Sequence, residues 1–500
     1  MVFHLHEWGG YMFFNLGVLW NDIIRRVSQS GMTEIEFLEE EIKRWMAGPA
    51  HEDMLKGCAY YGDHQDIDHK ERMMIGAGGT RQAVHNLVNY RIMDNQYAKL
   101  VDQKANYLLA KPIELKTDGQ DGAYEQALDS IFNARYMKKL KKTGKNALNC
   151  GISWQLPYIS DTGDLKIKFI PGYQVLPFWH DDEHEELDAA LRIYPVTVYE
   201  GRTPKVITKV EYYTKDGVKF YIFDNQRLIP DNENTDSAYM KIDGRPMNWD
   251  RIPLIPFRAN DMEHPLICRV KCLQDALNQL MSSFFDNLSE DIRSTILVLY
   301  NYDGENLDQF RQNLMTYGCV KIRRDDYAKG GVEALHIEVN PDNYELVQKL
   351  LKKAIIENGR GFDAKDERFT SGQANQLNIQ SAYSDIDLEA DDMESEFQES
   401  LENLLWFVNT YLTNIKHITP AGDVQFIFNR DMLTNQAEEI QNCRNSVGIL
   451  SDETIIAHHP WTKDTAAELE KLKQQRQQEA DAMNPYQNSF GNQQYPNNGE

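Results

Sequence analysis

Two short clusters of histidine and acidic residues are the groups in this sequence best suited to chemistry. The first is His64-Asp66-Asp68-His69, and the second runs from His180 to Glu186 and reads HDDEHEE. Oxygen-rich loops can hold Ca²⁺ or Mg²⁺, so a metal-dependent phosphohydrolase that uses these His/Asp clusters is one hypothesis. Adjacent acids on a turn are more often a solvated surface, and no nucleophile–base pair is recognisable beside them. We therefore assign no catalytic residue, no metal ligand and no cofactor.

Other catalytic signatures are missing from the sequence. The chain has no G-x-x-x-x-G-K-[ST] motif, no HExxH and no G-x-S-x-G, so we expect it not to be an enzyme.

The chain is strongly acidic. Lys and Arg number 53 against 77 Asp and Glu, which gives a net charge of −24. Such a surface does not grip nucleic acid by neutralising phosphates, although nucleic acid could slide past it. Six scattered cysteines fit reduced thiols better than a disulfide framework.

The first half of the chain predicts helices followed by an antiparallel β-region. The 500 residues exceed what one hydrophobic core usually holds, so two or more domains are expected. Helices are predicted over 33–48, where Thr33 and Glu36 form a capping box, and over 81–110 and 123–150. From 151 to 228 the pattern alternates in twos between turn dipeptides, which indicates hairpins. The fold class is α+β.

The second half is dominated by three long helical patterns. They cover 265–292, 341–357 and 378–414, and the last would be ~50 Å long at 1.5 Å per residue. The apolar run Tyr11–Ile24 is shorter than the ~20 residues that span a bilayer, so no membrane span is expected. The Asn/Gln-rich tail 484–500 is predicted to be disordered.

Several phrases occur in an order that resembles a known family. They are LKGCAYYGD (55–63), NQYAKLVDQKANYLLAKP (95–112), IPLIPFRAN (252–260) and LVLYNYDGEN (297–306). The sequence is similar, from roughly residue 33 to 483, to the portal proteins of tailed bacteriophages, the family found in phages and prophages of Gram-positive bacteria. The specificity comes from the order of these phrases over most of the chain, because none of them is a catalytic fingerprint.

The resemblance implies a portal fold with an α/β wing, a two-helix stem, a small α/β clip, a long kinked helix and an α-helical crown, assembled as a ring. On this chain the implied parts are an N-terminal extension (1–32), wing (33–260), stem helices (261–292 and 341–357), clip (293–340), tunnel loop (358–378), long wing helix and strand (379–430), crown (431–483) and tail (484–500).

The family's role implies a channel at one capsid vertex, through which double-stranded DNA is packaged and ejected. Implied partners are further copies in a ring of twelve, the terminase large subunit, the head–tail adaptor, and the major capsid and scaffolding proteins. The implied location is the virion, and the host cytoplasm during assembly. The candidate DNA-facing residues of the loop are Arg360, Lys365, Arg368 and Gln373. The candidate partner-docking residues of the clip are Asp303, Glu305, Arg323 and Arg324.

The loop 358–378 is formally neutral, which suits weak contact with a moving duplex. Three cations, Arg360, Lys365 and Arg368, are balanced by three acids within the same loop. Each neutralised phosphate would add affinity and slow translocation. The glycines at 359, 361 and 372 are expected to provide mobility.

Overall fold

The structure is a computed structural model of the 500-residue chain. It describes residues 31–75, 80–83, 88–118, 122–234, 237–242, 245–290, 296–300, 331–335, 341–363, 376–430, 436–462 and 465–483. The chain divides into two compact units. The first holds the described residues up to Phe362 together with Asp385–Arg430, and the second holds Asp363, residues 376–384 and those from 436 onward.

The first unit opens with two helices, α2 (Glu34–Met46) and α3 (Pro49–Tyr61). The predicted capping box at the start of α2 is confirmed: Thr33 Oγ1 accepts from the Glu36 N–H, and the Glu36 carboxylate accepts from the Thr33 N–H. Leu38 and Ile42 of α2 are fully buried against a sheet described below. A 3₁₀ turn, η1 (Asp66–His69), and a hairpin of β1 (Met73–Ile75) and β2 (Arg81–Ala83) follow.

The predicted antiparallel β-region is confirmed, and it forms two sheets. The larger has the order β10-β9-β8-β7-β6 and the smaller the order β13-β4-β5, with antiparallel pairing throughout. The bounds are β4 (Ile152–Ile159), β5 (Leu165–Ile170), η2 (Gly172–Gln174), β6 (Val175–Trp179), β7 (Leu187–Glu200), β8 (Thr203–Thr214), β9 (Gly217–Asp224), β10 (Arg227–Pro230) and β13 (Ile255–Arg258). Two short strands, β11 (Met240–Ile242) and β12 (Arg245–Met247), pair antiparallel between β10 and β13 in the sequence.

A helical core packs beside the smaller sheet. It contains α4 (Gln96–Leu109), α5 (Gly122–Ile131), α6 (Ala134–Cys150) and the later helix α11 (Gln376–Tyr411), which continues into a π-helical turn, η3 (Leu412–Lys416). Tyr97, Val101, Leu140, Phe257 and Phe397 are among its buried members. Two more strands, β3 (Glu114–Thr117) and β16 (Val424–Ile427), pair antiparallel.

The predicted helix over 81–110 is wrong in its first part. Residues 81–83 are strand β2, residues 88–95 have no regular secondary structure, and only α4 is helical. The apolar spacing through this stretch resembles a helix, but every second backbone N–H group from Tyr90 to Gln96 bonds to a side chain of another helix. Tertiary contacts of this kind override local propensity. The predicted helix 123–150 is divided into α5 and α6, because Asn133 caps α6 by accepting from the Arg135 and Tyr136 N–H groups.

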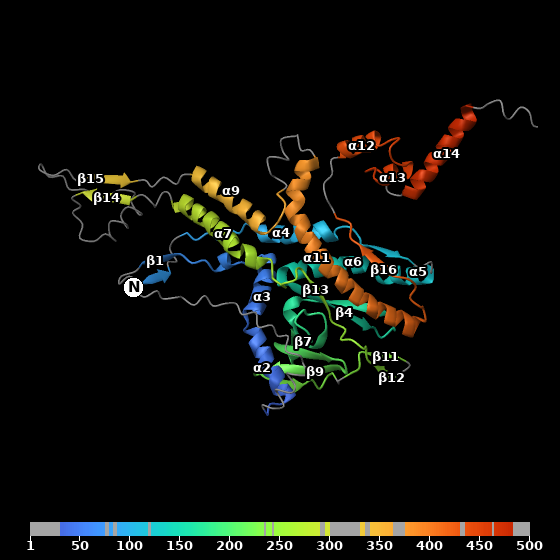
Figure 1. Ribbon diagram of the computed structural model, residues 1–500. Helices are drawn as coiled ribbons and strands as arrows, with labels where there is room; N and C mark the ends of the chain where they lie inside the picture. Colours follow the sequence, from blue (N-terminus) through green and yellow to red (C-terminus); the bar gives the residue numbers. More distant parts are fainter. Residues whose placement is uncertain are drawn as a thin grey trace, which may run out of the picture. The chain divides into compact units, whose positions relative to one another are not determined.

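Two long helices lie side by side in the first unit (Figure 1). They are α7 (Ile267–Glu290) and α9 (Pro341–Asn358), and they confirm the predicted helices at 265–292 and 341–357. Between them in sequence, β14 (Ile296–Tyr300) and β15 (Gly331–Leu335) pair antiparallel. The remainder of the expected clip, the N-terminal extension up to residue 30 and the tail 484–500 lie outside the described residues.

From residue 436 onward, the described part of the second unit contains the helices α12 (Gln436–Asn445), α13 (Asp452–Ala457) and α14 (Thr465–Met483). Ser451 caps α13 by accepting from the Thr454 N–H. Within the described ranges, no helix is both long enough and apolar enough to cross a membrane.

Candidate functional site

The candidate site is the junction where α7 and α9 join the rest of the first unit. Near the C-terminal end of α7, the ring of Phe284 lies 4.7 Å from that of Tyr344, near the start of α9. Asn287 Nδ2 donates to the Tyr344 hydroxyl at 3.3 Å. Farther along α9, Lys352 pairs with Asp94 at 2.7 Å. Because the backbone of Asp94 in turn bonds to Asn278, earlier on α7, the two helices run antiparallel.

A polar ladder on α7 holds the segment 88–96. We give this name to four residues at four-residue spacing, Gln274, Asn278, Ser282 and Asp286, all of which are 0–2% exposed. Each accepts a hydrogen bond from a backbone N–H of the segment. The pairs are Gln96 to Gln274 (3.0 Å), Asp94 to Asn278 (3.0 Å), Ile92 to Ser282 (2.9 Å) and Tyr90 to Asp286 (2.7 Å).

The spacing of the ladder follows from elementary geometry. Four residues of α-helix rise ~6.0 Å, and two residues of extended chain span ~6.6 Å. Every second N–H of an extended segment that runs antiparallel to α7 therefore meets every fourth residue of the helix. Buried backbone N–H groups need partners, and the ladder supplies them where no neighbouring strand is present.

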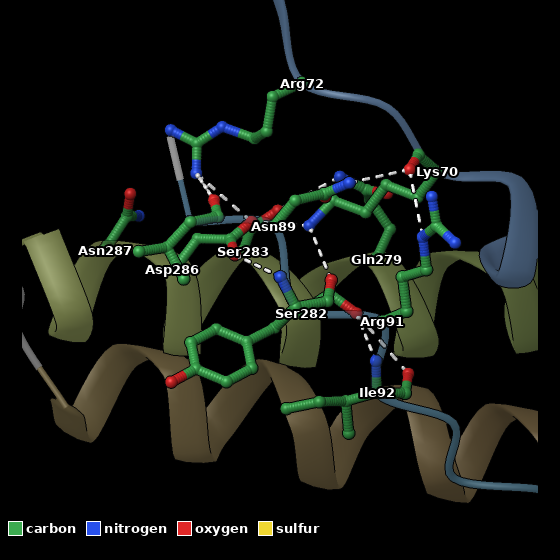
Figure 2. Close-up of polar contacts among 12 residues, drawn as sticks. Lys70, Arg72, Asn89, Arg91, Ile92, Gln279, Ser282, Ser283, Asp286 and Asn287 are labelled. Carbon is green, nitrogen blue, oxygen red and sulfur yellow. Dashed lines mark hydrogen bonds and ion pairs between the residues drawn. The ribbon is translucent and has the colours of Figure 1, made fainter. Parts of the chain in front are cut away.

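The ladder ends in a buried ion-pair cluster, drawn in Figure 2. Asp286 Oδ2 lies 2.5 Å from Lys70 Nζ and 3.2 Å from an Arg72 guanidinium nitrogen. Lys70 also joins the two chain segments, because its Nζ donates to the Tyr90 carbonyl and its own carbonyl accepts from Asn89 Nδ2. Burial opposes ionisation of Asp286, but the hydrogen bonds from Lys70 and the Tyr90 N–H outweigh it, and its pKa is lowered.

A second charged cluster, the Glu389 cluster, joins four parts of the chain. Glu389 of α11 pairs with Arg269 of α7 (2.7 Å), Lys104 of α4 (3.5 Å) and Arg360, which follows α9 (3.4 Å). Glu389 and Lys104 are 7% and 5% exposed. One carboxylate thus faces three cations with little water to screen them. Burial lowers the pKa of Lys104 to about 8, although the nearby Glu389 opposes that shift.

Arg430, just after β16, has the reverse arrangement to Glu389, because it is one cation that faces several acids. Its guanidinium pairs with three acids of α11, namely Asp387, Asp391 and Glu394. The carboxylates together raise its pKa, against the effect of burial. α11 therefore supplies one acid that faces three bases, Glu389, and three acids that face one base, Arg430.

The start of the expected tunnel loop is firmly packed. The side-chain amide of Gln103 bonds to both the carbonyl and the N–H of Phe362, at 2.6 and 3.0 Å. Gly359 and Gly361 are buried, and a Cβ on either would lie within 2.6 Å of the Leu100 side chain. These two glycines were expected to provide mobility. In the structure they allow close packing against α4.

The predicted site residues fall on both sides of the described boundary. Arg360 is described: it has a positive φ of 46°, its side chain is half exposed, and it contacts Glu389. The other loop candidates, Lys365, Arg368 and Gln373, lie outside the described residues, as do the clip candidates Asp303, Glu305, Arg323 and Arg324.

The two His/Asp clusters are held by contacts within the protein. Asp66 pairs with Lys271 at 2.5 Å, and His180 with Asp188 at 3.1 Å. His184 Nδ1 lies 2.9 Å from Glu263, and its ring stacks on Trp179. In the part of the chain that the structure describes, no group of three His, Cys, Asp or Glu side chains is arranged to hold a metal ion.

Sequence reasoning missed both the ladder and the Glu389 cluster. The ladder has a signal, which is a polar stripe at constant four-residue spacing along a helix free of Gly and Pro. A buried polar stripe requires a partner that offers a row of backbone groups. The Glu389 cluster has no comparable signal, because its residues lie at 104, 269, 360 and 389 and only the tertiary fold brings them together.

Comparison with known proteins gives the class of the chain. The family model for the phage portal protein, SPP1 Gp6-like, matches residues 51–482. The chain is 27% identical over 437 residues to the portal protein of Bacillus phage SPP1, which covers 86% of this chain and 85% of that protein. It is 26% identical over 432 residues to the portal protein of Clostridium phage phiCD119, covering 84% and 92%.

Solved structures similar to the chain include two neck assemblies. One is the neck of an empty GTA particle computed with C6 symmetry (10% identity, TM-score 0.38, 72% of this chain and 88% of that chain). The other is the neck of a native GTA particle computed with C12 symmetry (13%, 0.37, 73% and 89%). Because the family model spans most of the sequence, the chain belongs to the SPP1 Gp6-like family of phage portal proteins.

Proposed function

We propose that copies of this chain form a twelve-membered ring around the channel through which DNA enters and leaves a phage capsid. The family match over residues 51–482 carries this proposal. In it, α7 and α9 are the stem, and residues 293–340 are the clip that docks the terminase large subunit and later the head–tail adaptor. The wing, residues 33–260, contacts the major capsid and scaffolding proteins. The terminase supplies the packaging energy, and the ring acts without catalysis of its own.

An exposed apolar stripe on the stem supports assembly. Leu346 and Leu350 of α9 are 58% and 57% exposed, and Leu288 of α7 is 54% exposed. Large exposed apolar side chains on two helices that pack together indicate an interaction surface. A ring needs two complementary faces on each subunit, and this stripe is our candidate for one of them.

The DNA-facing part of the proposal concerns the loop from 358 to 378, with Arg360, Lys365, Arg368 and Gln373 as contact residues. Arg360 suits a transient contact. Its half-exposed guanidinium is shared with Glu389 at 3.4 Å, and a passing phosphate could compete for it. The chain's net charge of −24 keeps the remaining attraction to DNA weak.

The Glu389 cluster is our candidate for mechanical coupling between these parts. Because one carboxylate holds α4, α7, α11 and the residue that begins the loop, a displacement of Arg360 changes the charge balance at all four. In this proposal the loop has two arrangements in equilibrium. They are coupled to the helices only if the contacts made with Glu389 differ between the two arrangements.

Electron microscopy of the purified full-length protein, alone and with its capsid and scaffolding proteins, tests the proposal. Rings with a central opening are expected. Compact particles without an axial opening under both conditions would contradict it. A second test measures DNA packaging by particles whose portal carries Lys365→Glu and Arg368→Glu. Reduced packaging with intact rings is expected, and unchanged packaging would remove these residues from the DNA-facing set.

A further inference from the structure

Two cysteines that are 92 positions apart in the sequence meet in the first unit. Cys58 lies on α3 and Cys150 is the last residue of α6. Their sulfur atoms are 3.4 Å apart, and both are free thiols in the structure. Cys58 is half-buried, whereas Cys150 is fully buried.

The helix backbones are close enough at this point for a covalent link. The residues that precede the two cysteines, Gly57 and Asn149, nearly touch: a Cβ on Gly57 would lie 2.0 Å from the Asn149 carbonyl oxygen. Disulfides require Cα atoms within ~4.4–6.8 Å of each other, which helices packed this closely can satisfy. Gly172 also leaves room, since a Cβ there would lie 2.8 Å from the Cβ of Cys150.

The surroundings give the two thiols different roles. Asn146 Nδ2 donates to Cys58 Sγ at 3.7 Å, and Cys150 bonds to the same sulfur. The hydrogen bond with Cys150 is the largest cause of a lowered pKa at Cys58, whereas burial is the main reason that the pKa of Cys150 is raised. Cys58 is thus the more accessible thiol and the more readily ionised one, which are the properties of an attacking sulfur.

We propose that Cys58 and Cys150 are a reversible disulfide site that ties α3 to the end of α6. A small-molecule disulfide is the oxidant. The Cys58 thiolate attacks one of its sulfurs, forming a mixed disulfide and releasing one thiolate. The Cys150 thiolate then attacks Cys58 Sγ, forming the protein disulfide and releasing the second. The two protein thiols lose two protons and two electrons, and the small disulfide gains both as two thiols.

The experiment uses full-length protein that is fully reduced and then equilibrated in buffers of reduced and oxidised glutathione. Alkylation, proteolysis and mass spectrometry locate the remaining thiols. The expected result is a linked Cys58–Cys150 peptide in a chain of monomeric mass on a non-reducing gel, with four of six cysteines still alkylated. Alkylated Cys150 beside glutathione-bearing Cys58 would overturn the proposal. So would linkage of either cysteine to another position or another chain.

Two variants test the order of the two steps and the specificity of the link. Cys150→Ser removes the second step, so glutathione should accumulate on Cys58. Cys272→Ser is the matched control, because Cys272 is a free cysteine exposed on α7 and is not a member of the pair. It should leave the yield of the linked peptide unchanged, and a loss of the link in this variant would count against the assignment.

Discussion

The carboxylate of Asp286 lies 2.5 Å from the ammonium group of Lys70, although 216 positions separate them in the sequence. Their side chains are only 2% and 8% exposed. This pair closes the polar ladder near the C-terminal end of α7. It connects α7 to the segment that leads from the N-terminal helices into α4.

Replacing Asp286 by Asn should destabilise the first unit by about 3 kcal/mol at neutral pH. The substitution leaves the Lys70 charge buried without its counter-ion, which is more costly than losing an exposed pair. Urea unfolding of the full-length protein measures the change. Glu345→Gln is the matched control, because the pair of Glu345 with Lys349 is exposed and its loss should have no measurable effect.

The same pair predicts a pH dependence. Because the pKa of Asp286 is lowered in the folded state, its contribution is present above the ordinary carboxyl range. It is lost as the pH falls through the lowered folded value. The difference in free energy of unfolding between wild type and Asp286→Asn should therefore shrink in acid. A difference that stays constant from pH 7 to pH 3 would show that the ion pair is not its cause.

Ser282→Ala should open the middle of the ladder. The Ile92 N–H loses its acceptor in a fully buried position, at a cost of about 1–2 kcal/mol. Hydrogen exchange at the Ile92 amide should accelerate. Ser283→Ala is the control from the same helix, since Ser283 Oγ accepts from Gln279 within α7. Equal acceleration in both variants would mean that the helix as a whole, and not the ladder bond, had been weakened.

Lys104→Met should stabilise the protein at pH 7 by about 1–2 kcal/mol, because it removes a buried charge while Arg269 still pairs with Glu389. The pKa of Lys104 is about 8 when folded, below its ordinary value, so the unfolded chain binds more protons between these two values. Wild-type stability therefore gains from rising pH across that range. The advantage of the variant should decrease from pH 8 to pH 10. Lys99→Met, exposed on the same helix, should show neither effect.

Leu350→Glu should prevent ring formation and leave the subunit folded. A charge placed on the exposed stripe of α9 would have to be desolvated on assembly. Native mass spectrometry gives the oligomeric state, and circular dichroism gives the fold. Val206→Glu on β8 replaces an apolar residue that is 67% exposed and lies outside α7 and α9, and it should leave assembly intact. Rings of normal abundance with Leu350→Glu would exclude the stripe from the subunit interface.

Local signals predicted the elements of this fold better than their contacts. The capping box at Thr33 and the turn dipeptides of the β-region each act within a few residues, and both signals are confirmed. The segment 88–95 was misread because its partner, α7, is nearly two hundred residues away. Its apolar spacing resembles a helix, and nothing nearby shows that its N–H groups are already engaged.

The candidate site was predictable only in outline. The long helices α7 and α9 follow from periodicity, but the Glu389 cluster and the Cys58–Cys150 contact depend on helices that meet after folding. A pattern in one sequence does not contain distances between remote positions. The glycines at 359 and 361 illustrate the same limit: the residue type was read correctly as permissive, and the fold uses that permissiveness for close approach.

The constant spacing of the ladder makes any sliding along α7 a stepwise process. Backbone N–H and carbonyl groups alternate along each edge of an extended segment. A shift by one residue would therefore present carbonyl groups where N–H groups now lie. Only a displacement of two residues, ~6.6 Å, restores donor to acceptor. Four bonds must break together before the next position is reached. The segment should therefore keep its register on α7 under small forces, and only a force large enough to break the four hydrogen bonds should move it.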